Sequence, residues 1–250
     1  MAPRDWDAAV YDRVSAPLEA MGRDVLDRLE LRGDETVLDA GCGSGRVTAA
    51  LVERLPAGRV IAVDAAPSMV AQARERLGDR ADVRVADLTA LELDTRVDAV
   101  LSTATFHWIA DHDRLFERLL GVLRPGGRLV AQCGGAGNIG ELKAAAERVG
   151  QREPFAPALA GWPGPWFFAS PEETAARLER LGWVDVWTWS HDVRVTPDDP
   201  REYLGTVALG SHLDRLAPGL RGPFVDAVIA ELEEPVADYV RLNILARSPS

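Results

Sequence analysis

Lysine, cysteine and long apolar runs are scarce in this sequence of 250 residues. Its one lysine is Lys143, and its formal net charge at pH 7 is −11. Because sequence-independent binding of nucleic acid needs a basic patch, we expect neither DNA nor RNA as a partner. An anionic membrane surface is disfavoured for the same reason.

The two cysteines, Cys42 and Cys133, make neither a disulfide framework nor a metal-binding spacing. We therefore expect two reduced thiols in the core and no metal site. No stretch approaches the ~18 uninterrupted apolar residues of a membrane span, and the opening MAPRDWDAAVYDRVS lacks an apolar segment. These absences predict a soluble, cytoplasmic protein.

Short apolar runs alternate with amphipathic ones through the first half of the chain. Strands are expected at 35–40, 59–65, 82–87, 97–103 and 127–135. Helices are expected between them at 45–55, 67–77 and 111–123, the last closed by the turn RPGG. This alternation predicts an α/β fold, with a doubly wound, mainly parallel sheet covered on both faces.

The second half of the chain is less regular. We expect a helix at 138–149, a Pro-, Gly- and aromatic-rich loop or lid at 152–168, and two or three short helices around APGLRGP in 198–234. A helix at 170–182 opens with a capping signature, Ser170 and Glu173. Strands at 183–195 and 237–248 should pair antiparallel at one sheet edge. The shared parity of Trp183, Trp187 and Trp189 predicts one core-facing side.

Residues 38–46, LDAGCGSGR, carry the strongest functional signal. Glycines here let the chain turn sharply at the end of the first strand and bring bare backbone to a ligand. A dinucleotide site would need the spacing G-x-G-x-x-G, but the third glycine comes one residue early and Arg46 stands in its place. Asp39 would repel a pyrophosphate and suits a cationic ligand. S-adenosylmethionine is such a ligand, and Asp64 could accept its ribose hydroxyls at the end of the second strand.

Five ordered blocks carry a family resemblance: VLDAGCGSGRVT, VIAVDAAPSMVAQAR, VADL, VDAVLSTATFHWI and LRPGGRLVAQ. Together they resemble the class I S-adenosylmethionine-dependent methyltransferases. The opening WDAAVYDRVS and the run from STATFHWI to QCGG resemble the trans-aconitate methyltransferase branch, which methylates small carboxylic acids. The resemblance covers residues 5–140. It implies one methyltransferase domain over 1–250, with an N-terminal helical cap segment (1–34), a cofactor-binding core (35–135) and cap insertions at 136–170 and 198–234.

The resemblance implies a role for each residue beside the methionine half of the cofactor. Asp39 would face the amino group, unless it only caps the turn. Gly41, Cys42 and Gly43 would offer backbone contacts. Ser102 would lie under the methionine portion, although it could equally satisfy local backbone.

The nucleoside half is implied in the same way. Asp64 would accept the ribose hydroxyls, and Ala65 and Met69 would flank the adenine. Asp87 would receive the adenine amino group, unless it only forms an Asx turn, and Leu88 would pack beside the ring. In the N-terminal segment, Tyr11 would close over the cofactor or pack its helix onto the body.

The acceptor side is less determined. A carboxylic acid is ionised at neutral pH and needs only positioning, whereas a phenol or alcohol would need a base. His107 and Trp108 are the candidate catalytic residues, although His107 could be satisfied by backbone, and the resembled branch often places an amide residue at that position. His212 is a second candidate base; we expect His112 at the surface and His191 in a structural role.

The variable half should supply the charge partner and the roof of an acceptor cavity. An arginine would pair with an acid, the candidates being Arg194, Arg201, Arg221 and Arg241. Aromatic residues of the lid, Trp162, Trp166, Phe167 and Phe168, could roof a hydrophobic cavity or pack under the insertion.

We therefore expect methyl transfer from S-adenosyl-L-methionine to a small molecule, with O-methylation of a carboxylate favoured. The alternatives are a hydroxyl-, N- or C-methyltransferase of a natural-product pathway, an enzyme acting on a carrier-bound acyl chain, and a non-catalytic sensor or partner protein that binds the cofactor. The oligomeric state is left open.

Overall fold

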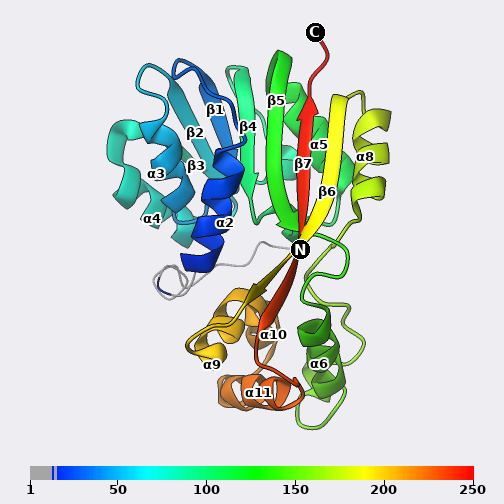
Figure 1. Ribbon diagram of the computed structural model, residues 1–250. Coiled ribbons are helices and arrows are strands. Elements are labelled where there is room, and N and C mark those ends of the chain that lie inside the picture. The colour runs from blue at the N-terminus through cyan, green and yellow to red at the C-terminus, as the bar shows by residue number, and fades with distance from the viewer. Residues whose placement is uncertain (1–12, 14–15) are drawn as a thin grey trace.

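The computed structural model describes residue 13 and residues 16–250. Tyr11 lies outside the described residues. Figure 1 shows an upper part built around one sheet and a smaller helical part beneath it. The two strands at the right of the sheet continue downward and join the two parts.

Among the described residues, seven strands form one sheet in the spatial order β3-β2-β1-β4-β5-β7-β6. The first five pair in parallel, and β7 runs antiparallel to both β5 and β6. The doubly wound sheet and the antiparallel edge pair are thus confirmed. The strands are β1 Thr36–Ala40, β2 Arg59–Asp64, β3 Asp82–Val85, β4 Val97–Thr103, β5 Leu123–Gly134, β6 Val184–Val195 and β7 Ala237–Arg247.

Helices cover both faces of the sheet. α2 (Ala16–Leu26), α3 (Arg46–Glu53) and α4 (Pro67–Leu77) lie on one face, and α5 (His112–Val122) and α8 (Pro171–Arg180) lie on the other. Single turns η1 (Gly78–Arg80), η2 (Leu88–Ala90) and η3 (Phe106–Trp108) follow α4, β3 and β4. The predicted capping box of α8 is present, since Ser170 and Glu173 each donate a backbone N–H to the other's side chain at 3.1 Å.

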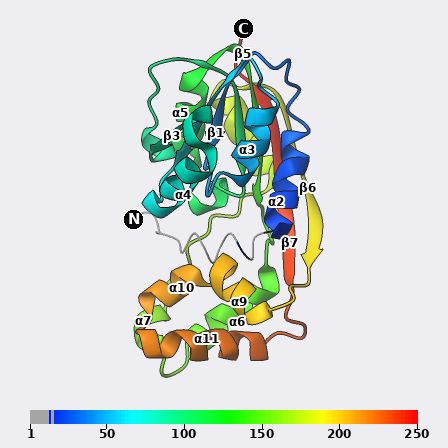
Figure 2. The ribbon, with the colours of Figure 1, turned by 90° about the vertical axis from the view of Figure 1, so that its left-hand side faces the viewer.

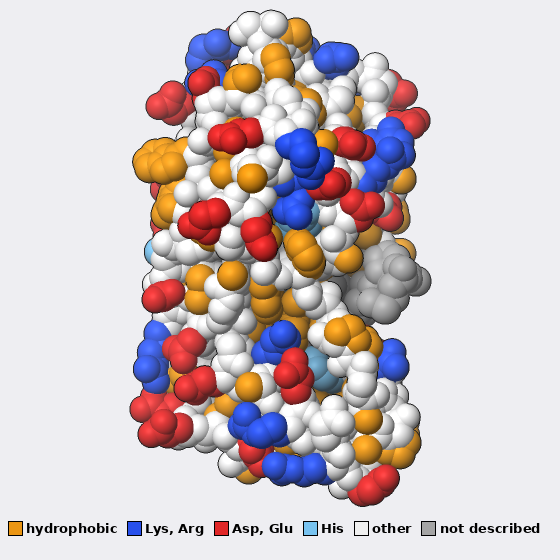
Figure 3. All heavy atoms as spheres, turned by 90° about the vertical axis from the view of Figure 1, so that its right-hand side faces the viewer, with side chains coloured by type: hydrophobic (Ala, Val, Ile, Leu, Met, Phe, Trp, Pro, Cys, Tyr) orange, Lys and Arg blue, Asp and Glu red, His pale blue; other side chains and the backbone are white. Residues whose placement is uncertain are grey.

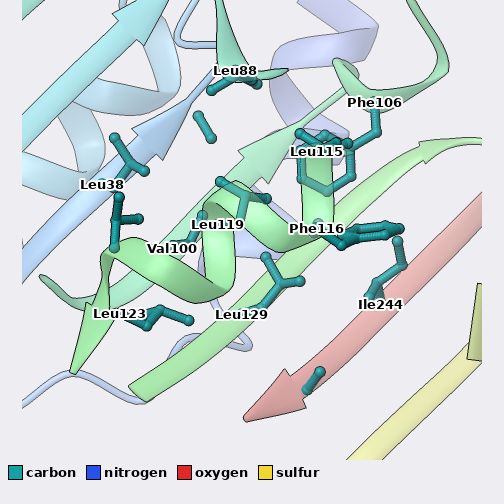
Figure 4. Packing of buried hydrophobic residues seen from close by; sticks show 14 of the residues in the cluster. Leu38, Leu88, Val100, Phe106, Leu115, Phe116, Leu119, Leu123, Leu129 and Ile244 are labelled. Atoms are coloured by element: carbon teal, nitrogen blue, oxygen red, sulfur yellow. The ribbon is translucent and has the colours of Figure 1, made fainter. Parts of the chain in front are cut away.

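Two apolar clusters hold these layers together, because successive strand residues point to opposite faces. On the α5 face, Leu115, Phe116 and Leu119 are fully buried against the sheet (Figure 4). On the opposite face, α2, α3 and α4 bury side chains such as Leu26 and Leu51. Each such side chain contributes roughly 1.5–3 kcal/mol, and together they make the sheet a rigid base for the loops at its edge.

The helical part below the sheet has an apolar cluster of its own, and we call it the cap. It lies under the carboxyl ends of β1–β5 (Figures 1 and 2). Leu18 and Met21 of α2 pack on its cluster, while Val25 and Leu26 pack on the sheet, so α2 bridges the two parts. The cap consists of α6 Gly140–Gly150, α7 Ala156–Leu159, α9 Pro200–Tyr203, the π-helical η4 Leu204–Ala208, α10 Gly210–Arg215 and α11 Pro218–Ala230.

The predicted common core face of three tryptophans is wrong. Trp183 is 3% exposed, whereas Trp187 is 64% exposed and Trp189 is half-buried. The pairing of β6 with β7 shifts register between Val184 and Trp187, and Asp185 has a φ of 50°. An irregularity of this kind inverts the alternation of side chains along the strand.

Short helices are present within 198–234, as predicted, and α11 includes most of APGLRGP, because Pro218 occupies the first turn, where a missing N–H costs little. Two local predictions were wrong. β5 begins at Leu123, so the expected turn RPGG belongs to the strand. The lid at 152–168 contains the short helix α7.

Two further findings concern the absences in the sequence. Cys42 and Cys133 are free and buried, as predicted. None of the described helices is both long and apolar enough to span a bilayer.

Candidate active site

The loop after β1 is tied to the neighbouring strand by its backbone. The N–H groups of Gly41 and Cys42 both donate to the carbonyl of Val63, at 2.8 and 2.9 Å. Gly41 has a φ of 88°, and a Cβ there would lie 2.1 Å from the Thr105 hydroxyl oxygen. Gly43 has a φ of 53°, and a Cβ there would meet no atom within 4 Å. The loop therefore presents bare backbone to open space, which suits a closely held ligand.

Asp39 is buried at the end of β1 and is 1% exposed. The Thr48 hydroxyl donates to its Oδ2 at 2.7 Å, and the described residues form no other side-chain hydrogen bond with it. Burial raises the pKa of Asp39 from 3.8 to about 7, and the Asp64 charge adds to this rise. A ligand cation would relieve both effects. Thr48 was not predicted, because a threonine in the first turn of a helix carries no signal of its own.

Asp64 ends β2 and holds the glycine loop. Gly43 N–H donates to its Oδ2 and Ala66 N–H donates to its Oδ1, each at 2.9 Å. Burial raises the pKa of Asp64. Since each carboxylate oxygen has a second lone pair, Asp64 can still accept ligand hydroxyls. Next to it, Ala65 is half-buried and Met69 is 3% exposed.

Asp87 and Leu88 follow β3, the next strand of the sheet. Leu88 is buried in the apolar cluster on the α5 face. Asp87 is exposed, and its Oδ1 accepts hydrogen bonds from the Thr89 N–H and hydroxyl, each at 2.8 Å. The Asx turn considered from the sequence is therefore present. An adenine contact by Asp87 stays a prediction.

The end of β4 closes the glycine loop from the other side. Ser102 is buried and donates its hydroxyl to the carbonyl of Ala40 at 2.6 Å. Ala104 has a φ of 56°, rare for a residue with a side chain, and the hydroxyl of Thr105 lies 3.2 Å from the carbonyl of Gly41. The sequence carried no signal for Ala104 or Thr105, because neither belongs to a motif and their conformation depends on the neighbouring loop.

His107 follows this turn and is 8% exposed. The backbone N–H of Gly134 donates to its Nδ1 at 3.2 Å, so Nε2 carries the proton of the neutral ring. Burial, together with the charges of Arg241 and His112, lowers the pKa of His107 from 6.5 to about 3. His107 is therefore a hydrogen-bond donor through Nε2 rather than a base at neutral pH. The backbone contact considered from the sequence is present.

An aromatic wall runs from His107 into the cap. The ring centroid of His107 lies 5.1 Å from that of Trp108 and 5.9 Å from that of Phe168. Trp166 stacks on Phe168 at 5.8 Å and lies 6.3 Å from Trp108. His212 continues the wall, 5.5 Å from Trp166.

The other histidines are all held within the structure. The surface position predicted for His112 is wrong: it is 2% exposed, and its Nε2 lies 3.0 Å from the carbonyl of Phe106. His191 Nδ1 lies 3.0 Å from the amide nitrogen of Asn243, in the predicted structural role. Burial lowers the pKa of His212 to about 4.

Arg241 separates clearly from the other three candidate arginines. Arg194 and Arg201 lie at the surface in ion pairs with acids, and Arg221 bonds the carbonyl of Leu216. Arg241 is 3% exposed, on β7 opposite Gly134, and donates from Nε to Gln132 Oε1 at 3.1 Å. Its charge reaches His107, so it lies beside the predicted acceptor side.

The site's chemistry fits the cofactor expected from the sequence. Asp39 and Asp64 interact electrostatically, and burial makes both favour a cationic partner. The open backbone at Gly43 donates to Asp64, so an acidic side chain lies directly beside the open space. In the described part of the chain, no cluster of three or more His, Cys, Asp or Glu side chains could hold a metal ion.

Residues 37–127 match the family described as a methyltransferase domain. A trans-aconitate 2-methyltransferase from Methylobacterium radiotolerans is 31% identical over 257 aligned residues, covering 97% of this chain and 96% of the relative. One from Shigella flexneri is 36% identical over 128 residues, so that alignment spans about half of each protein (51% and 50%).

Among solved structures, the phosphoethanolamine N-methyltransferase 2 of Haemonchus contortus, in complex with S-adenosylhomocysteine, superposes with a TM-score of 0.67. It is 19% identical, and the match covers 97% of this chain and 57% of that one. That likeness supports the fold. The sequence relatives and the matched domain carry the assignment further: the chain belongs to the class I S-adenosylmethionine-dependent methyltransferases, and S-adenosylmethionine is its cofactor.

Proposed function

We propose that this enzyme methylates a carboxylate oxygen of a small organic acid. The observation that carries the proposal is the buried guanidinium of Arg241 beside a neutral His107. Both groups donate hydrogen bonds, and one bears a fixed positive charge. A carboxylate is the acceptor group that matches a donor pair of this kind.

Protonation supports the same acceptor. With a pKa of about 3, the ring of His107 is neutral at working pH, and its Nδ1 is already occupied by the Gly134 N–H. It therefore has no free lone pair with which to take a proton from a phenol or alcohol. A carboxylic acid with a pKa near 4 is already ionised and makes no such demand.

The chemistry then reduces to positioning. When bound, S-adenosylmethionine supplies a methyl group on a positively charged sulfur, so that a carboxylate oxygen forms the new O–C bond while the C–S electron pair goes to sulfur. No proton moves in this step. Arg241 and His107 would hold the carboxylate in line with the C–S bond, and the aromatic wall would exclude water.

The relatives point the same way, since two of them bear the name trans-aconitate 2-methyltransferase, which describes the methylation of a carboxylic acid. For this chain, the small-molecule acid remains part of the proposal.

Incubation with cofactor labelled in its methyl group and a panel of acids, phenols and amines tests the proposal. We expect labelled product from acids alone, and we expect mild base to release the label as methanol. Label transferred to phenols or amines would replace the carboxylate with another acceptor. Cofactor binding without any product would favour the non-catalytic sensor.

A further inference from the structure

A cavity of about 420 Å³ opens at the junction of the sheet and the cap. It is bounded by the 136–138 turn after β5, by the first two turns of α6, and by Trp166 and Phe168. We call it the waist cavity. Figure 3 shows hydrophobic side chains at the narrow waist of this side of the molecule. The volume is within the ordinary range for small-molecule sites.

Gly134 joins the waist cavity to the acceptor side. Its N–H donates to His107 Nδ1, and a Cβ on Gly134 would lie 2.8 Å from Phe168 and 2.7 Å from the amide nitrogen of Asn138. Phe168 and Asn138 both line the cavity. Phe168 thus belongs both to the aromatic wall, 5.9 Å from the ring of His107, and to the lining of the cavity, so the wall leads from His107 to the cavity.

Asn138 offers the cavity a neutral donor. It is 4% exposed, and its Oδ1 accepts the N–H of Val240 at 3.0 Å, which fixes the orientation of the amide. Nδ2 therefore points away from Val240, and no described residue accepts a hydrogen bond from it. An amide N–H that faces a cavity suits a hydroxyl, carbonyl or ether oxygen of a ligand.

The charged side chains that line the cavity compensate each other, so the cavity offers no net positive charge to a second carboxylate. Lys143, the single lysine of the chain, lines it together with Glu147, and the two form an ion pair with Nζ 3.6 Å from Oε1. A second ligand carboxylate would meet Glu147 as well as Lys143. By contrast, the ring of Trp166 offers a broad apolar face, stacked at 13° on Phe168.

We propose that the waist cavity binds the body of the acceptor, and that the acceptor is a ring-bearing monocarboxylic acid rather than a polycarboxylate. This inference rests on the proposed carboxylate methylation. One buried arginine matches one carboxylate, the aromatic wall matches a ring, and the compensated Lys143–Glu147 pair disfavours further negative charge.

A matched set of acids tests the acceptor class. With trans-cinnamate, 3-phenylpropionate, hexanoate and trans-aconitate as probes, we expect kcat/KM for the two ring-bearing acids to exceed both others by at least about tenfold. A higher kcat/KM for trans-aconitate than for the ring-bearing acids would overturn the inference.

Paired variants test the cavity itself. Trp166→Leu keeps apolar volume but removes the stacking face, and we expect KM for 3-phenylpropionate to rise about tenfold with kcat and adenosylhomocysteine affinity unchanged. Trp187→Leu, at an exposed tryptophan of β6, is the control and should leave KM unaltered. Glu147→Gln should raise kcat/KM for trans-aconitate relative to that for 3-phenylpropionate. Equal effects of Trp166→Leu and Trp187→Leu would contradict the assignment.

Calorimetry separates this inference from the proposed function. Protein saturated with adenosylhomocysteine should bind 3-phenylpropionate, and Trp166→Leu should weaken that binding. Binding without ester formation would remove the proposed function and leave the cavity assignment standing. Ester formation from acids that does not depend on Trp166 would remove the cavity assignment and leave the proposed function standing.

Discussion

The proposed cofactor edge, which is the glycine loop after β1 with Asp39 and Asp64, and the proposed acceptor side adjoin at Gly41 and Thr105, yet they are built by different means. The cofactor edge uses backbone groups and two carboxylates that stand at the ends of β1 and β2. The acceptor side uses side chains brought from β4, β5, the lid and β7, with His107 and Arg241 134 residues apart in numbering. A shared cofactor can be held by local geometry, whereas acceptor choice depends on how distant segments pack.

The substitution with the largest expected effect lies in the glycine loop after β1. In Gly41→Ala, the added Cβ overlaps Thr105 and the φ of 88° is strained, so cofactor affinity should fall by roughly 1000-fold or more. Gly182→Ala is the control, since Gly182 also has a positive φ but a Cβ there meets no atom within 4 Å. It should cost about 1 kcal/mol of stability and leave binding intact. Calorimetry with adenosylhomocysteine measures the affinity of both variants. Equal losses of affinity in Gly41→Ala and Gly182→Ala would refute the clash with Thr105.

The pH dependence of stability isolates Asp39. Because its pKa rises from 3.8 unfolded to about 7 folded, the folded state binds the proton more tightly between these values. The ligand-free protein should therefore lose stability, by at most about 4 kcal/mol, as pH rises from 4 to 7. Asp39→Asn should remove this part of the slope in urea unfolding and leave the contribution of Asp64, whose pKa is also raised. An unchanged slope would mean that Asp39 ionises freely.

Removal of the positive charge of Arg241 tests the acceptor side. Arg241→Met should lower kcat/KM for an acid by about 100-fold, the loss of a charge-assisted hydrogen-bonded pair. Arg194→Met, at an exposed ion pair with Glu234, should stay within about twofold of wild type. Adenosylhomocysteine affinity in Arg241→Met reports whether the fold survives. Activity retained with intact binding would exclude Arg241 from the site.

A smaller effect on kcat shows whether His107 acts as a hydrogen-bond donor or as a general base. With a pKa of about 3, its ring should not titrate between pH 5.5 and 8, so kcat for an acid should show no histidine step there. His107→Phe should lower kcat by about tenfold, whereas His107→Gln, which retains an N–H donor, should restore most of it. A rate that rises with pH near 6.5 in wild type alone would indicate a base.

The smallest effect lies outside the site. Ser170→Ala removes the cap of α8 and should cost about 1 kcal/mol in urea unfolding. Cofactor affinity and methyl transfer should not change. A change in cofactor affinity or in methyl transfer would show that α8 is coupled to the site. It would also weaken the contrast between the cofactor edge and the acceptor side.

Sequence patterns predicted the sheet better than the cap. Alternating runs located the first five strands and helix α4 over 67–77, because each buries one face in a regular period. They failed at Trp187, where an irregular pairing with β7 inverted the faces. There, the pairing with another strand overrode the local alternation.

The sequence by itself determined where Asp39, the glycines and Asp64 lie, since they stand at strand ends whose positions follow from local periodicity. Tertiary structure alone decided the features of the proposed acceptor side: that Arg241 is the buried one of the four candidate arginines, that Nδ1 of His107 accepts a backbone N–H, and that Asn138, Lys143 and Trp166 line one cavity. The physical reason is that burial and electrostatics depend on through-space neighbours. For Arg241 these neighbours come from strands far apart in the chain, and no local pattern encodes them.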